Sequence, residues 1–153
     1  MDVDRFKLQE LEKRAKRAGI QIITTKKLER NGQLPKSLHQ VADYLLLDVP
    51  CSGTGVIRRN PDAKWKLNPK FIEEIIQLQR KILLEYSIML KDGGKLLYAT
   101  CSILPDENER QIAWFLEESE AGKEFTLVKS KRIMPQDEGF DGFYMALLQK
   151  KSL

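Results

Sequence analysis

Apolar positions along the chain follow two patterns, short continuous runs and runs at helical spacing, which predict strands and helices in alternation. The predicted strands are residues 20–25, 41–48, 96–100, 125–128 and 143–148. The predicted helices are residues 5–18, 69–90 and 105–120. Strands that alternate with helices indicate an α/β protein, and we expect the last two strands to form an antiparallel pair that closes the sheet.

Capping residues set the limits of these predicted helices. Asp4 is a suitable N-cap for the first helix, and Gly19 suits the position just after its end. Asn68 is a suitable N-cap for the second, with Pro69 at its first position. The turn at residues 91–94, which contains two glycines, is expected to end that helix and start the next strand.

The strand at residues 96–100 leads directly into a cysteine and then a predicted helix start. Pro105 suits the first helical position, and Asp106 and Glu107 suit the positive end of the helix dipole. Cys101 is therefore expected at the carboxyl end of a strand and near a helix N-terminus. Open α/β sheets bind ligands at that edge, and a helix N-terminus can favour the reactive thiolate.

A second cysteine follows the strand at residues 41–48 in the same way. Taken alone, Cys101 is better explained as an inert, buried small residue. Cys51 changes this interpretation, because two strands then bring two Cys-Ser pairs to one edge of the sheet. Asp48 ends a very apolar run, and a carboxylate there is expected to be either functional or paired, since an unpaired buried charge is costly.

Composition is typical of one globular domain, residues 1–153, with 42% hydrophobic and 31% charged residues. No apolar run approaches the roughly 20 residues of a membrane span, so no membrane partner is expected. Two cysteines without a secretory leader favour the reducing cytoplasm over a disulfide-bonded protein. Two cysteines and His39 cannot build an ordinary four-ligand zinc site without carboxylates, so no metal site is expected.

Positive charge is concentrated in two places. Residues 1–40 carry ten Lys/Arg against five Asp/Glu, within a net charge of +4. Arg58, Arg59 and Lys64 lie close together beside Trp65. These three cations suit a lip that contacts RNA phosphates, and a solvated surface is an equally consistent interpretation. Trp65 itself is expected to pack in the core.

Two motifs carry a resemblance to a known family. They are Asp-Val-Pro-Cys-Ser-Gly-Thr-Gly at residues 48–55 and Tyr-Ala-Thr-Cys-Ser-Ile-Leu-Pro-Asp-Glu-Asn-Glu at residues 98–109, with support from residues 57–65 and 138–144. Nearly the whole chain resembles RNA cytosine-5 methyltransferases of the Sun/Fmu (RsmB)–Nop2 type. The Pro-Cys-Gln motif of DNA cytosine methyltransferases is absent from the sequence.

The resemblance implies a Rossmann-like class I S-adenosylmethionine-dependent methyltransferase fold that is N-terminally truncated, with its first strand and Gly-rich loop absent. It implies that Asp2, Asp48 and Pro50 contact S-adenosylmethionine, although Asp2 alone would read as a frayed terminal carboxylate. The family's Gly-Asp pair on the adenine side is replaced by residues 26–30, where Glu29 is the one acidic candidate. We therefore expect impaired cofactor binding and a missing N-terminal part as partner.

The resemblance also implies the chemistry. Cys101 would attack carbon 6 of cytosine, Cys51 would assist removal of the carbon 5 proton and product release, and Asp48 would hydrogen-bond the ring. The implied substrate is RNA, and ribosomal RNA in particular. A non-catalytic half-domain that binds RNA is the alternative, whereas a thiol redox protein is disfavoured because the Cys-x-x-Cys spacing is absent.

Overall fold

The structure, a computed structural model, describes residues 1–29 and 34–152. The chain divides into two compact units, Met1–Leu34 and Pro35–Leu153, and each is considered by itself. Of the segment that replaces the family's adenine-side Gly-Asp pair, Arg30 lies outside the described residues.

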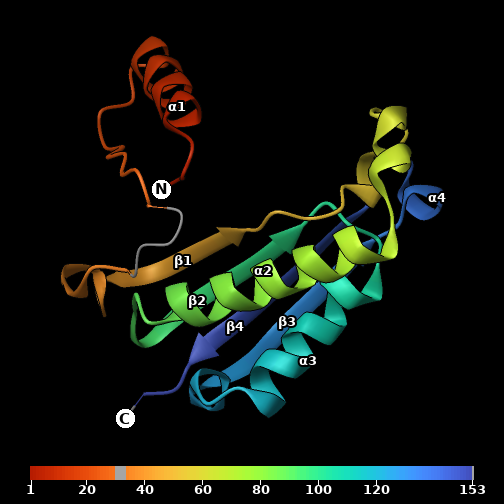
Figure 1. Cartoon of the computed structure of the whole chain (residues 1–153). Helices are drawn as coiled ribbons and strands as arrows, with labels where there is room; N and C mark the ends of the chain where they lie inside the picture. Colours follow the sequence, from red (N-terminus) through yellow and green to blue (C-terminus); the bar gives the residue numbers. More distant parts are fainter. Residues whose placement is uncertain (30–33, 153) are drawn as a thin grey trace. The chain divides into compact units, whose positions relative to one another are not determined.

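The described residues form α-helices, β-strands and short 3-10 helices, shown in Figure 1. The α-helices are α1 (Arg5–Arg17), α2 (Pro69–Ser87), α3 (Glu109–Glu118) and α4 (Pro135–Glu138). The strands are β1 (Ala42–Asp48), β2 (Leu90–Thr100), β3 (Phe125–Ile133) and β4 (Phe143–Lys150). The 3-10 helices are η1 (Lys36–Leu38), η2 (Thr54–Val56), η3 (Pro61–Lys66), η4 (Pro105–Glu107) and η5 (Ala121–Glu124).

The first unit consists of α1 and extended chain on either side of it. The Asp4 side chain caps α1 by accepting a hydrogen bond from the Phe6 N–H, as predicted. The predicted strand at residues 20–25 is wrong. That stretch has no strand partner in the described unit and leaves Ile22 93% exposed, because β-branched residues favour a strand only where a neighbour supplies the pairing.

The second unit is built on a four-stranded sheet with the order β1-β2-β4-β3. β1 and β2 are parallel, whereas β4 is antiparallel to both β2 and β3. The predicted strand at residues 41–48 and the antiparallel closing pair are confirmed. A parallel pair needs a long crossover connection, and the chain between β1 and β2 supplies it through α2.

Helices α2 and α3 lie along the same face of this sheet (Figure 1). Leu83 of α2 and Phe115 of α3 are fully buried against the sheet residues Leu96, Tyr98 and Leu148. On the opposite face of the edge strand β1, Tyr44 and Leu46 are 77% and 63% exposed. The core of the second unit therefore occupies the helical face.

Two helix boundaries differ from their predictions. The long helix begins at Pro69 as expected, but it ends at Ser87, and Leu90 is the first residue of β2 and not part of the helix. Pro105 starts the 3-10 helix η4, and the α-helix begins only at Glu109. The second difference arises because Glu107 points into the interior and hydrogen-bonds other loops, as described below.

No helix among the described residues is long and apolar enough to cross a membrane.

Replacing Leu83 by alanine should strongly destabilise the second unit. The side chain is 0% exposed, and truncating a fully buried leucine costs about 2–5 kcal/mol. The neighbouring Leu84 is 38% exposed, so Leu84→Ala is the matched control and should cost clearly less. Urea denaturation of both variants measures the difference in the free energy of unfolding, and equal losses would contradict the placement of the core.

Candidate active site

The parallel pairing of β1 and β2 brings the two cysteines together. Asp48 at the end of β1 pairs with Ala99 near the end of β2, so both strands release their following loops at the same edge. Cys51 and Cys101 lie in those loops, each half-buried, with their sulfur atoms 3.1 Å apart. The expectation of one shared edge is therefore realised as a direct thiol–thiol contact.

The contact between the two sulfur atoms gives the two thiols different pKa values. Either thiol can donate in the contact between the two sulfur atoms. With Cys51 as the donor, the hydrogen bond lowers the pKa of Cys101 to about 7, although burial acts against it. The same hydrogen bond, together with burial, raises the pKa of Cys51. With a pKa of about 7, about one half of Cys101 is thiolate near neutral pH, beside a Cys51 whose pKa is raised. A nucleophile and a neighbouring proton donor need such a difference in acidity.

Backbone hydrogen bonds between three loops hold the residues around Gly55 and Gly142 together at the outer side of the site. The Gly55 N–H donates to the Cys101 carbonyl at 2.9 Å, and the Gly142 N–H donates to the Gly55 carbonyl at 2.8 Å. A Cβ atom on Gly55 would lie 2.1 Å from the Gly142 carbonyl oxygen, so only glycine allows the two loops to approach this closely.

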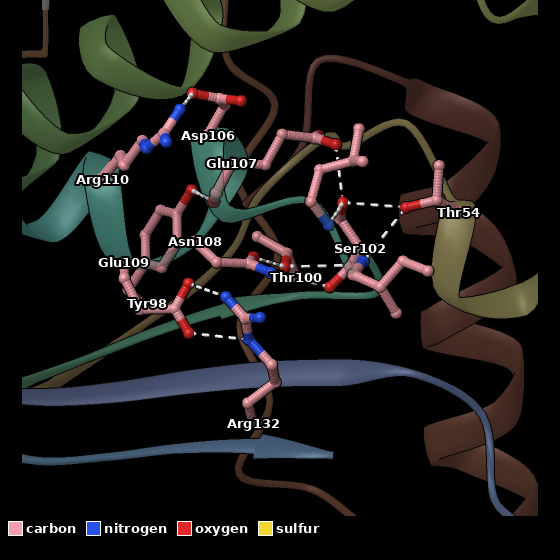
Figure 2. A network of polar contacts seen from close by, with 12 residues as sticks. Thr54, Tyr98, Thr100, Ser102, Asp106, Glu107, Asn108, Glu109, Arg110 and Arg132 are labelled. Carbon is pink, nitrogen blue, oxygen red and sulfur yellow. Dashed lines mark hydrogen bonds and ion pairs between the residues drawn. The ribbon is translucent and has the colours of Figure 1, made fainter. Parts of the chain in front are cut away.

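A buried carboxylate lies beneath the cysteine loops. Glu107 is fully buried and accepts four hydrogen bonds, from the Ser52 N–H (2.8 Å), the Ser52 hydroxyl (2.5 Å), the Ser102 hydroxyl (2.6 Å) and the Gln79 side-chain amide (3.0 Å). Figure 2 shows Glu107 bonded to Ser102, which in turn contacts Thr54 from the other loop. The serine that follows each cysteine is thus attached to one carboxylate.

The buried side chain of Asn108 also supports the Cys101 loop, from the side of the sheet. Asn108 accepts from the Thr100 hydroxyl at 2.5 Å and donates to the Ser102 carbonyl at 2.8 Å (Figure 2). Tyr98, on the same strand, donates its hydroxyl to the Glu107 carbonyl at 2.8 Å. Burial and the nearby Glu107 raise the pKa of Tyr98, so its hydroxyl keeps its proton as a donor. These bonds connect the end of β2 to η4.

Asp48 is exposed, contrary to one part of the prediction. Its carboxylate forms no hydrogen bond or ion pair with any residue that the structure describes, so the buried, paired alternative is wrong. The run at residues 44–47 is apolar, but β1 is an edge strand, and its end opens to solvent beside the cysteines. Pro50 is also exposed, and its carbonyl accepts from the Gln79 amide at 2.9 Å.

Asp2, the remaining predicted cofactor residue, belongs to the first unit. Its side chain accepts a hydrogen bond from the Asp4 N–H at 2.8 Å, and its backbone forms an isolated bridge with Lys27. Asp2 is therefore ordered by local contacts at the start of α1 and is not a frayed end.

The three predicted RNA-contacting cations lie on exposed chain around η3. Arg59 forms an ion pair with Asp141 at 2.5 Å, and Arg58 donates to the Gly139 carbonyl at 3.1 Å. Lys64 lies 4.8 Å from the centre of the Trp65 ring. Trp65 is 78% exposed, so the expectation that it packs in the core is wrong: η3 lies outside the sheet and presents the ring to solvent with its cation.

The sequence interpretation missed two polar residues of the site, Glu107 and Gln79. The sequence pattern places Glu107 at the positive end of a helix dipole, and Gln79 lies within the predicted helix at residues 69–90, whose apolar positions recur at helical spacing. Both are 0% exposed. A glutamine on the core side of an apolar helix was the available signal, because a buried amide needs partners.

An open, largely apolar groove of about 530 Å³ lies beside the site, between the start of α2 and the two loops, with Thr54, Ile72 and Leu104 among its walls. Neither cysteine lines this groove. The groove is therefore separate from the sheet edge that carries the sulfurs.

A mixed sheet with two strand-end loops of this kind is the fold of class I methyltransferases, and comparisons with known proteins agree. The structure superposes on the crystal structure of PH0851 with a TM-score of 0.89 and 37% identity, over 97% of this chain and 36% of that one. It superposes on NSun6 from Pyrococcus horikoshii, solved with SFG, with a TM-score of 0.80 and 25% identity, over 97% and 40% of the two chains.

Residues 1–149 match the family described as 16S rRNA methyltransferase RsmB/F, and the chain belongs to this family. It is 40% identical to ribosomal RNA small subunit methyltransferase B of Yersinia pseudotuberculosis over 99% of its own length. It spans 36% of the length of that relative. The expected family and fold class are confirmed.

Removing the Cys51 thiol should raise the pKa of Cys101. In Cys51→Ala the donor that lowers this pKa is lost while burial remains, so the midpoint should move from about 7 to the ordinary thiol value of 9.0 or above. The fraction of thiolate at pH 7 then falls from about one half to about one hundredth. The pH dependence of Cys101 alkylation by iodoacetamide, followed by peptide mass spectrometry, measures the midpoint. An unchanged midpoint would show that the thiols share no proton.

Proposed function

We propose that this chain is the cysteine-bearing part of an S-adenosylmethionine-dependent RNA methyltransferase that acts on carbon 5 of cytosine in ribosomal RNA. The observation that carries the proposal is the 3.1 Å contact between the Cys51 and Cys101 sulfurs at one edge of the sheet. Membership of the RsmB/F family supports RNA as the substrate class.

The two thiols suit covalent activation of a pyrimidine. Carbon 5 of cytosine is a poor nucleophile, so the ring needs activation before it can accept a methyl group. The Cys101 thiolate adds to carbon 6 with its electron pair, and the electrons of the 5,6 double bond move to carbon 5. Bound S-adenosylmethionine supplies the electrophilic methyl group. After methylation the carbon 5 proton leaves, the double bond reforms and the bond from Cys101 to carbon 6 breaks.

Cys51 is proposed to assist this second half of the reaction. Once Cys101 is bound to carbon, it no longer competes with Cys51 for a proton. Cys51 then loses its own proton to water, and its thiolate accepts the proton from carbon 5 while the carbon 6–sulfur electron pair returns to Cys101. A sulfur in contact with Cys101 lies within reach of the neighbouring ring carbon, so the 3.1 Å separation fits this role.

Asp48 is proposed to bind the ring edge. Its carboxylate is exposed at the same sheet edge and has no partner among the described residues, so it is available to accept hydrogen bonds from a cytosine amino group. The target base must leave its stack to reach this edge. A buried or paired carboxylate could not take this role without breaking an existing contact.

The donor set fits S-adenosylmethionine in part. The relative that was solved with SFG, an analogue of this cofactor, supports its use in the family. In the second unit, Asp48 and Pro50 are the exposed candidates at the edge beside β1, and Asp2 of the first unit is the candidate for the ribose hydroxyls. We propose that Asp48 and Pro50 contribute one side of a cofactor site on the second unit and that binding by this chain alone is weak.

RNA contact is proposed for Arg58, Arg59 and Lys64. All three residues are exposed, and the Arg59 side chain is 70% exposed despite its ion pair with Asp141. Exposed ion pairs are worth little, so a phosphate can compete for these cations. The exposed Trp65 beside Lys64 offers a surface on which an unstacked base can lie.

A half-domain that binds RNA without catalysis is the second candidate. The share of the relative that this chain spans, 36%, favours it, because a cofactor site can need residues from the remainder. Methyl transfer after addition of a separately expressed N-terminal part would favour the enzyme. RNA binding without activity under any complementation would favour the silent half-domain.

In a full-length enzyme that contains this chain, Cys51→Ala should accumulate a covalent complex with RNA, because release of the product is blocked after Cys101 has added. Cys101→Ala should form none. Denaturing gel electrophoresis of reactions with labelled ribosomal RNA measures the complex, and RNase digestion followed by mass spectrometry locates it. An adduct that persists in Cys101→Ala would contradict the assignment of the nucleophile.

Isothermal titration of S-adenosylmethionine into this chain should give weak or undetectable binding. Asp48 and Pro50 supply only one side of the proposed site, and the expected partners of the methionine moiety are not among the candidate residues. A dissociation constant at low micromolar or tighter would contradict the proposal that the site needs further residues.

A further inference from the structure

Burial of the Glu107 carboxylate costs free energy, and the proposed reaction does not explain why it is buried. A carboxylate loses several kcal/mol of hydration when it is buried, and it is retained only where donors replace the water. Glu107 is 0% exposed, and each of its oxygens accepts two hydrogen bonds. All four donors are uncharged: a backbone N–H, two hydroxyls and a side-chain amide. This arrangement matches a carboxylate held in a polar socket.

The donors come from the residues next to the reacting sulfurs. Ser52 follows Cys51 after β1, and Ser102 follows Cys101 after β2. Both hydroxyls donate to the same oxygen of Glu107, at 2.5 and 2.6 Å. One oxygen atom therefore ties together the two loops at positions one residue away from each sulfur.

The two loops are also joined by the Ile103 N–H, which donates to the Thr54 hydroxyl oxygen at 3.0 Å, and by contacts among hydroxyl groups. The serine hydroxyls lie 3.3 Å apart, and Thr54 approaches both Ser52 and Ser102 at 3.2 and 3.0 Å. These hydroxyl contacts are longer than the two bonds to Glu107 and depend on how the hydroxyls rotate. The carboxylate is the group that sets the direction of both serine hydroxyls.

We propose that Glu107 is a positioning residue that clamps the Cys51–Ser52 and Cys101–Ser102 turns to each other and so keeps the two sulfurs in contact. Its consequence for methyl transfer rests on the proposed function, whereas the clamp itself is a property of this chain. Among the described residues the Glu107 carboxylate bonds to Ser52, Ser102 and Gln79 and to neither sulfur.

Only a carboxylate satisfies this set of donors. In Glu107→Gln one oxygen becomes an NH₂ group, which cannot accept the bonds that the oxygen accepted. If the NH₂ replaces the oxygen bound to the Ser52 N–H and Gln79, two N–H donors face another donor. If it replaces the other oxygen, both serine hydroxyls must turn away from their present directions. Either orientation loosens the tie between the loops.

If Glu107 acted only through its negative charge, its replacement would have the opposite effect on the pKa of Cys101. The charge of Glu107 raises the pKa of Cys101, but this is the weakest of the influences on it, and the hydrogen bond from Cys51 is the strongest and lowers it. Removing a charge alone would therefore lower the pKa of Cys101. Removing a clamp separates the sulfurs, weakens the stronger hydrogen bond and raises that pKa.

The test is the pH midpoint of Cys101 alkylation by iodoacetamide in Glu107→Gln, measured on this chain by peptide mass spectrometry. Asp106→Asn is the matched control, because Asp106 is the adjacent carboxylate, lies at the surface and pairs with Arg110 at 2.7 Å (Figure 2). The clamp predicts a midpoint that rises from about 7 towards 9.0 in Glu107→Gln and stays in place in Asp106→Asn. A midpoint that falls or does not change in Glu107→Gln overturns the proposal.

Ser102→Ala keeps the proposal testable if Glu107→Gln does not fold. It removes one of the two hydroxyl ties and leaves the carboxylate with three donors, so the midpoint should rise by a smaller amount. Circular dichroism confirms that each variant is folded before alkylation. An unchanged midpoint in a folded Ser102→Ala also counts against the clamp.

The readout separates this proposal from the proposed function, because alkylation involves neither RNA nor cofactor. A raised midpoint in Glu107→Gln, together with a full-length enzyme that forms no RNA adduct, leaves the clamp in place and removes the methyltransferase assignment. Adduct formation by the full-length enzyme, together with an unchanged midpoint in Glu107→Gln, removes the clamp and leaves the methyltransferase assignment in place. In an active full-length enzyme the clamp predicts a lower kcat with little change in KM for RNA.

Discussion

The parallel pairing of β1 with β2 is the constraint on which the site depends. The register that places Asp48 opposite Ala99 makes both strands end at the same level, so the residues that follow them must share one edge of the sheet. A cysteine three positions after Asp48 and another two positions after Ala99 then meet above that edge. The antiparallel β4 on the other side of β2 holds the second strand in this register through six residue pairs from Lys95 to Thr100.

Strand ends alone leave loops free to separate, and buried polar contacts remove that freedom. Glu107 fastens the loops from below through their serines, while the close approach of Gly55 and Gly142 fixes them from the mouth. Both oxygens of Glu107 have their hydrogen bonds, and such a satisfied group favours one geometry because a change of either loop would leave a buried carboxylate oxygen unpaired. The lowered pKa of Cys101 and the raised pKa of Cys51 follow from the contact between the sulfurs that this geometry maintains.

The sequence was sufficient for the parts of this account that depend on local patterns. The strand ending at Asp48, the capped helices and the convergence of Cys51 and Cys101 could all be predicted from apolar runs and from the edge rule for α/β sheets. The features that depend on contacts between distant residues could not be predicted in this way. Glu107 follows a proline near a helix start, and only the folded chain shows it turned inwards to two serines 55 and 5 residues away. The failure of the predicted strand at residues 20–25 has the same origin, because a strand exists only where a neighbour pairs with it.

The most direct measurement of the central claim is an experimental structure of the reduced protein that resolves both cysteine side chains. The account predicts that the Cys51 and Cys101 sulfurs lie in contact on the same side of the sheet edge, as they do here at 3.1 Å, with the Glu107 carboxylate bonded to both serines. Sulfurs that point to opposite faces, or that are separated by more than the width of one pyrimidine ring, would contradict it.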